Sequence, residues 1–105
     1  MARSNQYRYK AKVVKVLKWN IFEVEIDLGF KVSIRLVLKL AGLETDPFVY
    51  NEQELFDFMR NFLEGEKVKI QTLREIKGLW LTTLWKEEVH VNSYLLKKNW
   101  VRQYN

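Results

Sequence analysis

Residues 11–45 read AKVVKVLKWNIFEVEIDLGFKVSIRLVLKLAGLET and contain three apolar runs with almost no spacer between them. In the middle run, apolar and acidic residues alternate strictly. The apolar set is Phe22, Val24, Ile26 and Leu28, and the acidic set is Glu23, Glu25 and Asp27. Such alternation is typical of a strand with one buried face. Gly29 marks a turn, so we predict consecutive antiparallel strands that supply most of a barrel wall.

The neighbouring runs extend this pattern on both sides. Residues 7–18 are rich in β-branched and aromatic residues and predict a first strand with a bulge after Val13. The third strand, residues 30–40, is long enough to bend and serve two halves of a barrel. Its predicted core face is Phe30, Val32, Ile34, Leu36, Leu38 and Leu40. On its other face, Lys31, Arg35 and Lys39 are expected to pair with the acidic residues of the second strand.

The second half of the chain adds two helices and two strands. After a loop at residues 42–50, Asn51 and Glu54 predict the start of a helix, and Gly65 predicts its end. The predicted core face of this helix is Leu55, Phe56, Phe58, Met59, Phe62 and Leu63. Strands are expected at residues 67–72 and 79–85, and a second helix at residues 91–100. His90, close to Glu87 and Glu88, is interpreted as a surface residue of a turn.

The order β-β-β-α-β-β-α, with a long third strand, predicts the fold class. We expect an α+β, mostly β protein: a five-stranded OB-type Greek-key barrel with a helix between strands three and four and a C-terminal helix. A length of 105 residues fits one domain. We expect residues 1–6 to be a flexible N-terminus and residues 7–105 to be the single barrel domain.

Composition narrows the functional classes. The chain has no cysteine, which excludes disulfides and thiolate metal sites. Its first ten residues lack the apolar segment of a secretory signal, and no apolar run approaches membrane-spanning length. A cytoplasmic protein without a membrane partner is expected. The net charge of +5 favours a polyanionic partner or a well-solvated surface, and the basic residues do not form one block.

Residues 10–46, KAKVVKVLKWNIFEVEIDLGFKVSIRLVLKLAGLETD, resemble the N-terminal half of the staphylococcal nuclease family. Members of this thermonuclease-like OB-fold family typically read V-V-x-V-x-D-G-D-T-F-x-V-x-I-D-L-G-F and then R-x-R-L-A-G-I-D-T-P-E. The similarity continues through LFDFMRNFLEGEKVKI, WLTTLW and VNSYLLKKNW. It covers nearly the whole chain and implies the same barrel.

In that family, phosphodiester hydrolysis uses a carboxylate-bound calcium ion, a glutamate near the attacking water and two arginines on the phosphate. This sequence departs from each element. The turn D-G-D-T is replaced by residues 18–21, Lys-Trp-Asn-Ile, and the first arginine by Lys39. The glutamate position holds Pro47, and the second arginine position holds Leu79, with Lys77 nearby. The resemblance therefore implies a retained scaffold without a catalytic residue, metal or cofactor.

Three functions remain open. The first is a catalytically inactive module that binds nucleic acid, single-stranded or duplex, and the second is a protein-interaction or inhibitor module of phage or mobile-element origin that uses the same cleft. The third is a residual metal-dependent nuclease with a rearranged site of Asn20, Glu44 and Asp46. Either binding module is expected to be a monomer or a small homo-oligomer. The predicted binding residues are Lys18, Trp19, Asn20, Lys39, Glu44, Asp46 and Lys77.

The aromatic residues of this patch carry separate expectations. Trp19 is expected to be exposed, because the family has a glycine at this position in a turn at the site. An exposed indole provides a surface on which nucleic-acid bases stack. Trp80 and Trp85 either extend the patch or belong to the core, and the core is the favoured interpretation.

Overall fold

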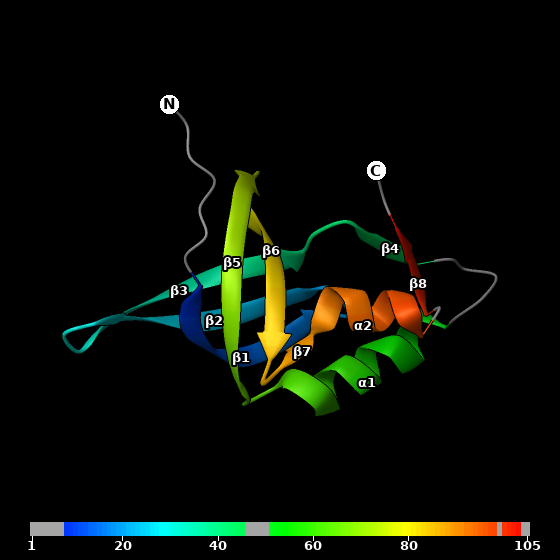
Figure 1. Cartoon of the computed structure of the whole chain (residues 1–105), viewed down its shortest axis with the longest axis horizontal. Helices are drawn as coiled ribbons and strands as arrows, with labels where there is room; N and C mark the ends of the chain where they lie inside the picture. The colour runs from blue at the N-terminus through cyan, green and yellow to red at the C-terminus, as the bar shows by residue number, and fades with distance from the viewer. Residues whose placement is uncertain (1–7, 46–50, 99, 104–105) are drawn as a thin grey trace.

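Five strands of the computed structural model close into a barrel (Figure 1). They are β1 (Tyr9–Lys18), β2 (Ile21–Gly29), β3 (Val32–Leu40), β5 (Lys67–Ile76) and β6 (Leu79–Lys86). Their order is β3-β2-β1-β5-β6, and a parallel pairing of β3 with β6 closes the ring. The structure describes residues 8–45, 51–98 and 100–103. The predicted OB-type barrel of α+β class is confirmed, including the third strand that serves two neighbours.

Shorter elements complete the described part of the chain. Helix α1 spans Glu52–Leu63 and helix α2 spans Val91–Lys97, so α2 is shorter than predicted. Strand β7 (Val89–His90) extends the sheet beside β6. Strands β4 (Leu43–Thr45) and β8 (Val101–Gln103) form a separate antiparallel pair that the sequence analysis did not predict. Neither helix in the described ranges combines the length and the apolar character that a membrane-spanning segment needs.

Both predicted ends of α1 are confirmed. The side-chain oxygen of Asn51 accepts hydrogen bonds from the backbone N–H groups of Gln53, at 2.7 Å, and Glu54, at 3.3 Å. This satisfies two donors that the first turn of a helix leaves free. Gly65 follows the C-cap residue with a φ of +82°, a conformation that glycine adopts without strain. Its N–H then donates to the carbonyl oxygen of Val13, which ties the end of α1 to β1.

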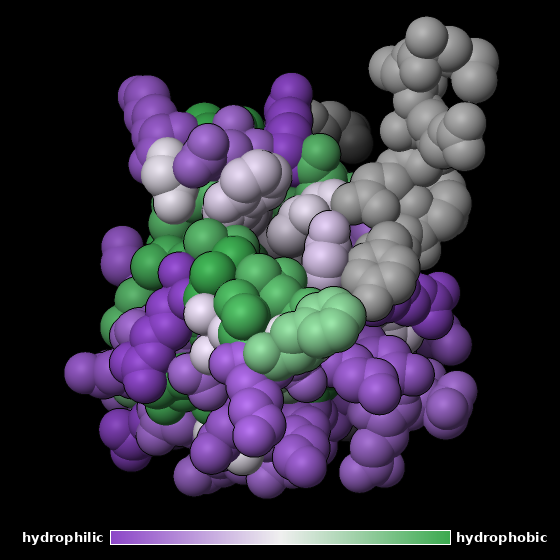
Figure 2. Space-filling model, turned by 90° about the vertical axis from the view of Figure 1, so that its left-hand side faces the viewer, coloured by the Kyte–Doolittle hydropathy of each residue, from purple (hydrophilic) through white to green (hydrophobic). Residues whose placement is uncertain are grey.

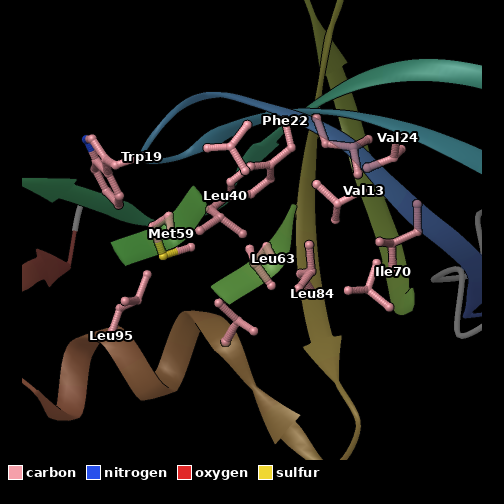
Figure 3. Packing of buried hydrophobic residues seen from close by; sticks show 14 of the residues in the cluster. Val13, Trp19, Phe22, Val24, Leu40, Met59, Leu63, Ile70, Leu84 and Leu95 are labelled. Atoms are coloured by element: carbon pink, nitrogen blue, oxygen red, sulfur yellow. The ribbon is translucent and has the colours of Figure 1, made fainter. Parts of the chain in front are cut away.

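The core lies inside the barrel and between the barrel and the two helices (Figure 3). On α1, Leu55, Met59 and Leu63 are fully buried, whereas the phenylalanines of the same face are only half-buried. The largest fully buried side chains are Phe22, Leu38, Leu40, Leu55, Met59, Leu63, Ile70, Leu84 and Leu95.

The predicted continuous core face of β2 and β3 is wrong in its outer half. Phe22 and Val24 are fully buried, but Leu28, Val32 and Ile34 are exposed. The reason is that these strands are longer than the barrel wall. Strand β1 pairs with β2 no further than Ile26, so the hairpin beyond this point projects away from the barrel (Figure 1).

Charge pairing across β2 and β3 is confirmed for one basic residue. A guanidinium nitrogen of Arg35 lies 3.6 Å from the carboxylate of Glu23, and another lies 3.9 Å from that of Glu25. Lys31 lies in the turn with a φ of +62°, and Lys39 is opposite Ile21. Neither lysine forms an ion pair with a described residue, so the predicted pairing is wrong for these two.

Candidate functional site

A cavity of about 750 Å³ lies where the turn between β1 and β2 meets β3, β4 and the first turn of α1. Five of the seven predicted binding residues line it: Lys18, Trp19, Asn20, Lys39 and Glu44.

The other two predicted residues are placed differently. Lys77 lies in the turn between β5 and β6 and is not part of the cavity wall. Asp46 falls outside the described residues, as do Pro47 and residues 1–6.

Strand register explains why the cavity residues converge. Lys18 is opposite Ile21 in the β1–β2 pair, and Ile21 is opposite Lys39 in the β2–β3 pair. The backbone N–H of Leu40 donates to the carbonyl oxygen of Asn20 at 2.9 Å, which holds the turn against β3. Two ammonium groups from different strands are therefore brought to one end of the barrel.

The expectation that Trp19 is exposed is wrong. Only 6% of its surface is accessible, and it belongs to the hydrophobic core. Figure 3 shows its indole at the edge of the core cluster, on the side of Met59. Burying a large apolar side chain is worth about 1.5–3 kcal/mol, which favours folding the ring inward over presenting it to solvent.

Phe56 is the more accessible of the two aromatic residues that line the cavity in the described part of the chain. It is half-buried on α1 and lines the cavity beside the turn between β1 and β2. The guanidinium carbon of Arg60 lies 5.6 Å from the centre of its ring. The sequence analysis placed Phe56 in the core, because it lies on the apolar face of the helix. Its position at the edge of that face is the signal that separates it from the fully buried Leu55 and Met59.

Both carboxylates that line the cavity among the described residues have partners. Glu44 forms an ion pair with Arg102, which β8 brings beside β4. Glu52 accepts a hydrogen bond from the hydroxyl of Thr45 at 2.9 Å. Arg102 was missed by the sequence analysis, because nothing in the local pattern of the C-terminal residues indicates that they pair with residues 43–45. Lys18 and Lys39 have no ion-pair partner within the part of the chain that the structure describes.

The described residues contain no group of three or more histidine or acidic side chains that could hold a metal ion. The rearranged site of Asn20, Glu44 and Asp46 includes a residue outside the described ranges, so it stays a hypothesis. Among its described members, Glu44 already forms an ion pair with the guanidinium of Arg102.

A second group of cations is formed by lysines of β1 and β5. Lys10 is directly opposite Lys69, and Lys12 is directly opposite Lys67. All four side chains are exposed. These lysines are not one block in the sequence, yet the antiparallel register makes them neighbours. Like charges directly opposite each other destabilise a strand pair, so the arrangement costs stability.

The interpretation of His90 as a surface turn residue is wrong. The residue is half-buried and ends β7. Its Nδ1 accepts a hydrogen bond from the backbone N–H of Ser93 at 3.1 Å and so caps α2. Its ring packs edge-on against Trp85, with 5.2 Å between ring centres. This histidine therefore has a structural role.

Trp80 and Trp85 are half-buried. Trp80 packs against the core, as the favoured interpretation predicts. The guanidinium carbon of Arg8 lies 3.9 Å from the ring centre of Trp85, which is a cation–π contact. Neither tryptophan lines the cavity.

No protein-family model matches the chain, and no curated protein matches it. The resemblance to the staphylococcal nuclease family therefore stays a prediction that rests on the residues quoted above.

Proposed function

We propose that the chain is a nucleic-acid-binding module of OB type without hydrolytic activity, and that the cavity binds single-stranded nucleic acid. One observation carries this proposal. Lys18 and Lys39 lie at one cavity in which the two carboxylates of described residues, Glu44 and Glu52, are already engaged. Two ammonium groups without a described counter-charge are suited to the phosphates of a nucleic-acid backbone.

The size and lining of the cavity support a nucleotide as occupant. A volume of about 750 Å³ lies within the range of small-molecule sites, roughly 300–1,000 Å³. The ring of Phe56 offers a face for base stacking, which is worth about 1–3 kcal/mol per base. The amide of Asn20 both donates and accepts hydrogen bonds, as the edge of a base requires.

The position of the cavity in the barrel also supports the proposal. OB-type barrels bind oligonucleotides on the face of strands two and three and at the loops between strands one and two and between strands four and five. The first loop here contains Trp19 and Asn20, and the second contains Lys77. Lys77 lies outside the cavity wall, in the second of these two loops.

The same contacts support binding without hydrolysis. A hard cation such as calcium takes oxygen ligands, most often carboxylates. At the cavity, Lys18 is cationic, Asn20 is neutral, and the carboxylate of Glu44 is paired with Arg102. Loss of a single electrostatic stabiliser of a transition state costs roughly 10²–10³ in rate. We infer that this arrangement favours retention of the strand over its cleavage.

The test is an anisotropy titration of a fluorescent single-stranded oligonucleotide with the full chain. Replacing Lys18 and Lys39 by alanine should weaken binding and reduce the salt slope by about 1.4, since each phosphate contact on a single strand contributes about 0.7. The matched control replaces Lys10 and Lys69, at the opposite end of β1 from Lys18. Equal losses in both variants would contradict a role for the cavity.

A protein-binding role is the second candidate. It is favoured by the exposed apolar side chains of the β2–β3 hairpin, which include Leu28, Val32 and Ile34. Figure 2 shows hydrophobic side chains gathered on this end of the molecule. Soluble proteins rarely leave large apolar patches uncovered. If the chain shows no affinity for oligonucleotides at low salt, this candidate replaces the first.

A further inference from the structure

The β2–β3 hairpin leaves one edge of a strand without a neighbour. On one side, β3 pairs with β2 from Val32 to Lys39. On the other side, it pairs with β6 only at Leu38, Lys39 and Leu40. Residues 32–37 therefore have no strand partner on that side among the described residues. An edge that combines free backbone groups with apolar side chains is a template for pairing with another strand.

The backbone hydrogen bonds show which groups this edge presents. The N–H of Leu40 donates toward β2, to Asn20, and the N–H of Ala41 donates toward β6, to Thr82. Because successive backbone groups of a strand alternate in direction, odd-numbered residues of β3 direct their N–H and C=O groups away from β2. The free edge therefore presents the backbone of Ser33 and Arg35.

We propose that this edge pairs with the same edge of a second copy of the chain, antiparallel and with Ile34 on the two-fold axis. The charges on the strand lead to this arrangement. In an antiparallel pair, the odd-numbered residues, whose backbone groups point away from β2, must lie opposite odd-numbered residues of the other copy. The two-fold axis therefore passes through a residue and not between two residues. An axis nearer the tip of the hairpin is excluded, because the turn interrupts the strand at Phe30 and Lys31, which have positive φ. An axis nearer the barrel is excluded, because β6 already pairs with this edge of β3.

Three registers remain, with the axis on Ser33, on Ile34 or on Arg35. Two of them bring like charges together. An axis on Arg35 places the two copies of this guanidinium directly opposite each other. An axis on Ser33 places Lys31 opposite Arg35 twice. Directly opposed like charges destabilise a strand pair, so both registers are disfavoured.

The register centred on Ile34 has no such conflict. It places Ser33 opposite Arg35 and Val32 opposite Leu36, and the two copies of Ile34 face each other on the axis. Apolar residues then oppose apolar residues on one face of a continuous sheet. Arg35 keeps its own carboxylate partners on β2, 3.6 Å and 3.9 Å away. Pairing with a second copy in this register thus satisfies the backbone groups of Ser33 and Arg35 without opposing like charges.

The mass of the full chain in sedimentation equilibrium gives the first test. We expect twice the chain mass at high concentration and dissociation on dilution. Ile34→Lys, which places two ammonium groups on the axis, should give a monomer with an unchanged circular dichroism spectrum. Leu73→Lys on β5 is the matched control, because Leu73 is also exposed, and it should remain a dimer. A wild-type monomer at every concentration would overturn the proposal.

The register is tested by oxidation of single-cysteine variants, since the chain has no cysteine of its own. In the proposed pair, the two Cα atoms of residue 34 are about 4.5 Å apart, within disulfide range. Those of residue 32 are about 14 Å apart, since they are offset by four residues along the strand and lie on two neighbouring strands. Ile34→Cys should therefore form a covalent dimer and Val32→Cys should not, although Val32 is the more exposed side chain at 51% against 42%. Equal cross-linking of both variants would overturn the register.

Discussion

The side-chain amide nitrogen of Asn92 donates a hydrogen bond to the carbonyl oxygen of Ala41, 3.1 Å away. Asn92 is buried at the start of α2, and Ala41 directly follows β3. The same amide donates to the carbonyl oxygen of Thr82 at 3.3 Å and accepts from the N–H of Leu84 at 3.1 Å. One side chain thus fastens α2 to β6 and to the residue that follows β3, beside the seam where the barrel closes.

Replacement of Asn92 by leucine should lower the free energy of unfolding by about 2–4 kcal/mol. The substitution leaves the N–H of Leu84 and the carbonyl oxygen of Ala41 without this partner, whereas the carbonyl oxygen of Thr82 keeps its bond from the N–H of Ala41. Each unsatisfied group costs about 1–3 kcal/mol. Urea unfolding followed by circular dichroism measures the change. The control is Asn61→Leu on the exposed face of α1, where a change within about 0.5 kcal/mol is expected. Equal losses at both sites would contradict this role for Asn92.

The chain should not cleave single- or double-stranded DNA or RNA in the presence of calcium, magnesium or manganese. The reason is that the carboxylate of Glu44 is paired with Arg102 and that of Glu52 accepts a hydrogen bond from Thr45, while Lys18 and Lys39 are cationic and Asn20 is neutral. Gel assays with each metal ion measure cleavage directly. Metal-dependent cleavage that disappears in Glu44→Ala would contradict the proposal and favour the residual nuclease.

Phe56→Ala should weaken the binding of single-stranded oligonucleotides by about 1–3 kcal/mol, because the stacking surface of the cavity is removed. Phe58→Ala is the matched control. It removes a half-buried phenylalanine of the same helix, which contacts Phe62 and Trp100 and does not line the cavity. Anisotropy titrations of both variants give the comparison. If Phe58→Ala weakens binding as much as Phe56→Ala does, a general loss of stability is the better explanation.

Lys69→Glu should raise the free energy of unfolding by about 0.2–1 kcal/mol, since it converts a directly opposed like-charge pair with Lys10 into an opposite-charge pair. Lys15→Glu should lower the free energy of unfolding, because Lys15 is opposite Glu23 and the substitution creates a like-charge pair. Chemical unfolding at low and high salt measures both, and salt should reduce both effects. A shift of the same sign in both variants would contradict the register argument.

The sequence predicted the barrel well, because the relevant signals are local. Alternation between residues 22 and 28 identified β2, and Asn51 and Gly65 marked both ends of α1. Each of these signals is read within a few residues of the chain. The site was predicted in part: five of its residues do line one cavity, but the exposure of Trp19 was wrong and Arg102 was missed.

The remaining features required the tertiary structure. Whether Trp19 faces solvent depends on which elements pack against the turn between β1 and β2. The pairing of Glu44 with Arg102 joins residues 58 positions apart. The opposition of Lys10 and Lys69 and the projection of the β2–β3 hairpin depend on register and on where neighbouring strands end.

The sequence by itself therefore determined the five barrel strands and the existence of the two helices, because periodicity and capping act between near neighbours. The tertiary structure decided which side chains meet, which charges are neutralised and which edge stays open, because these depend on contacts between distant segments.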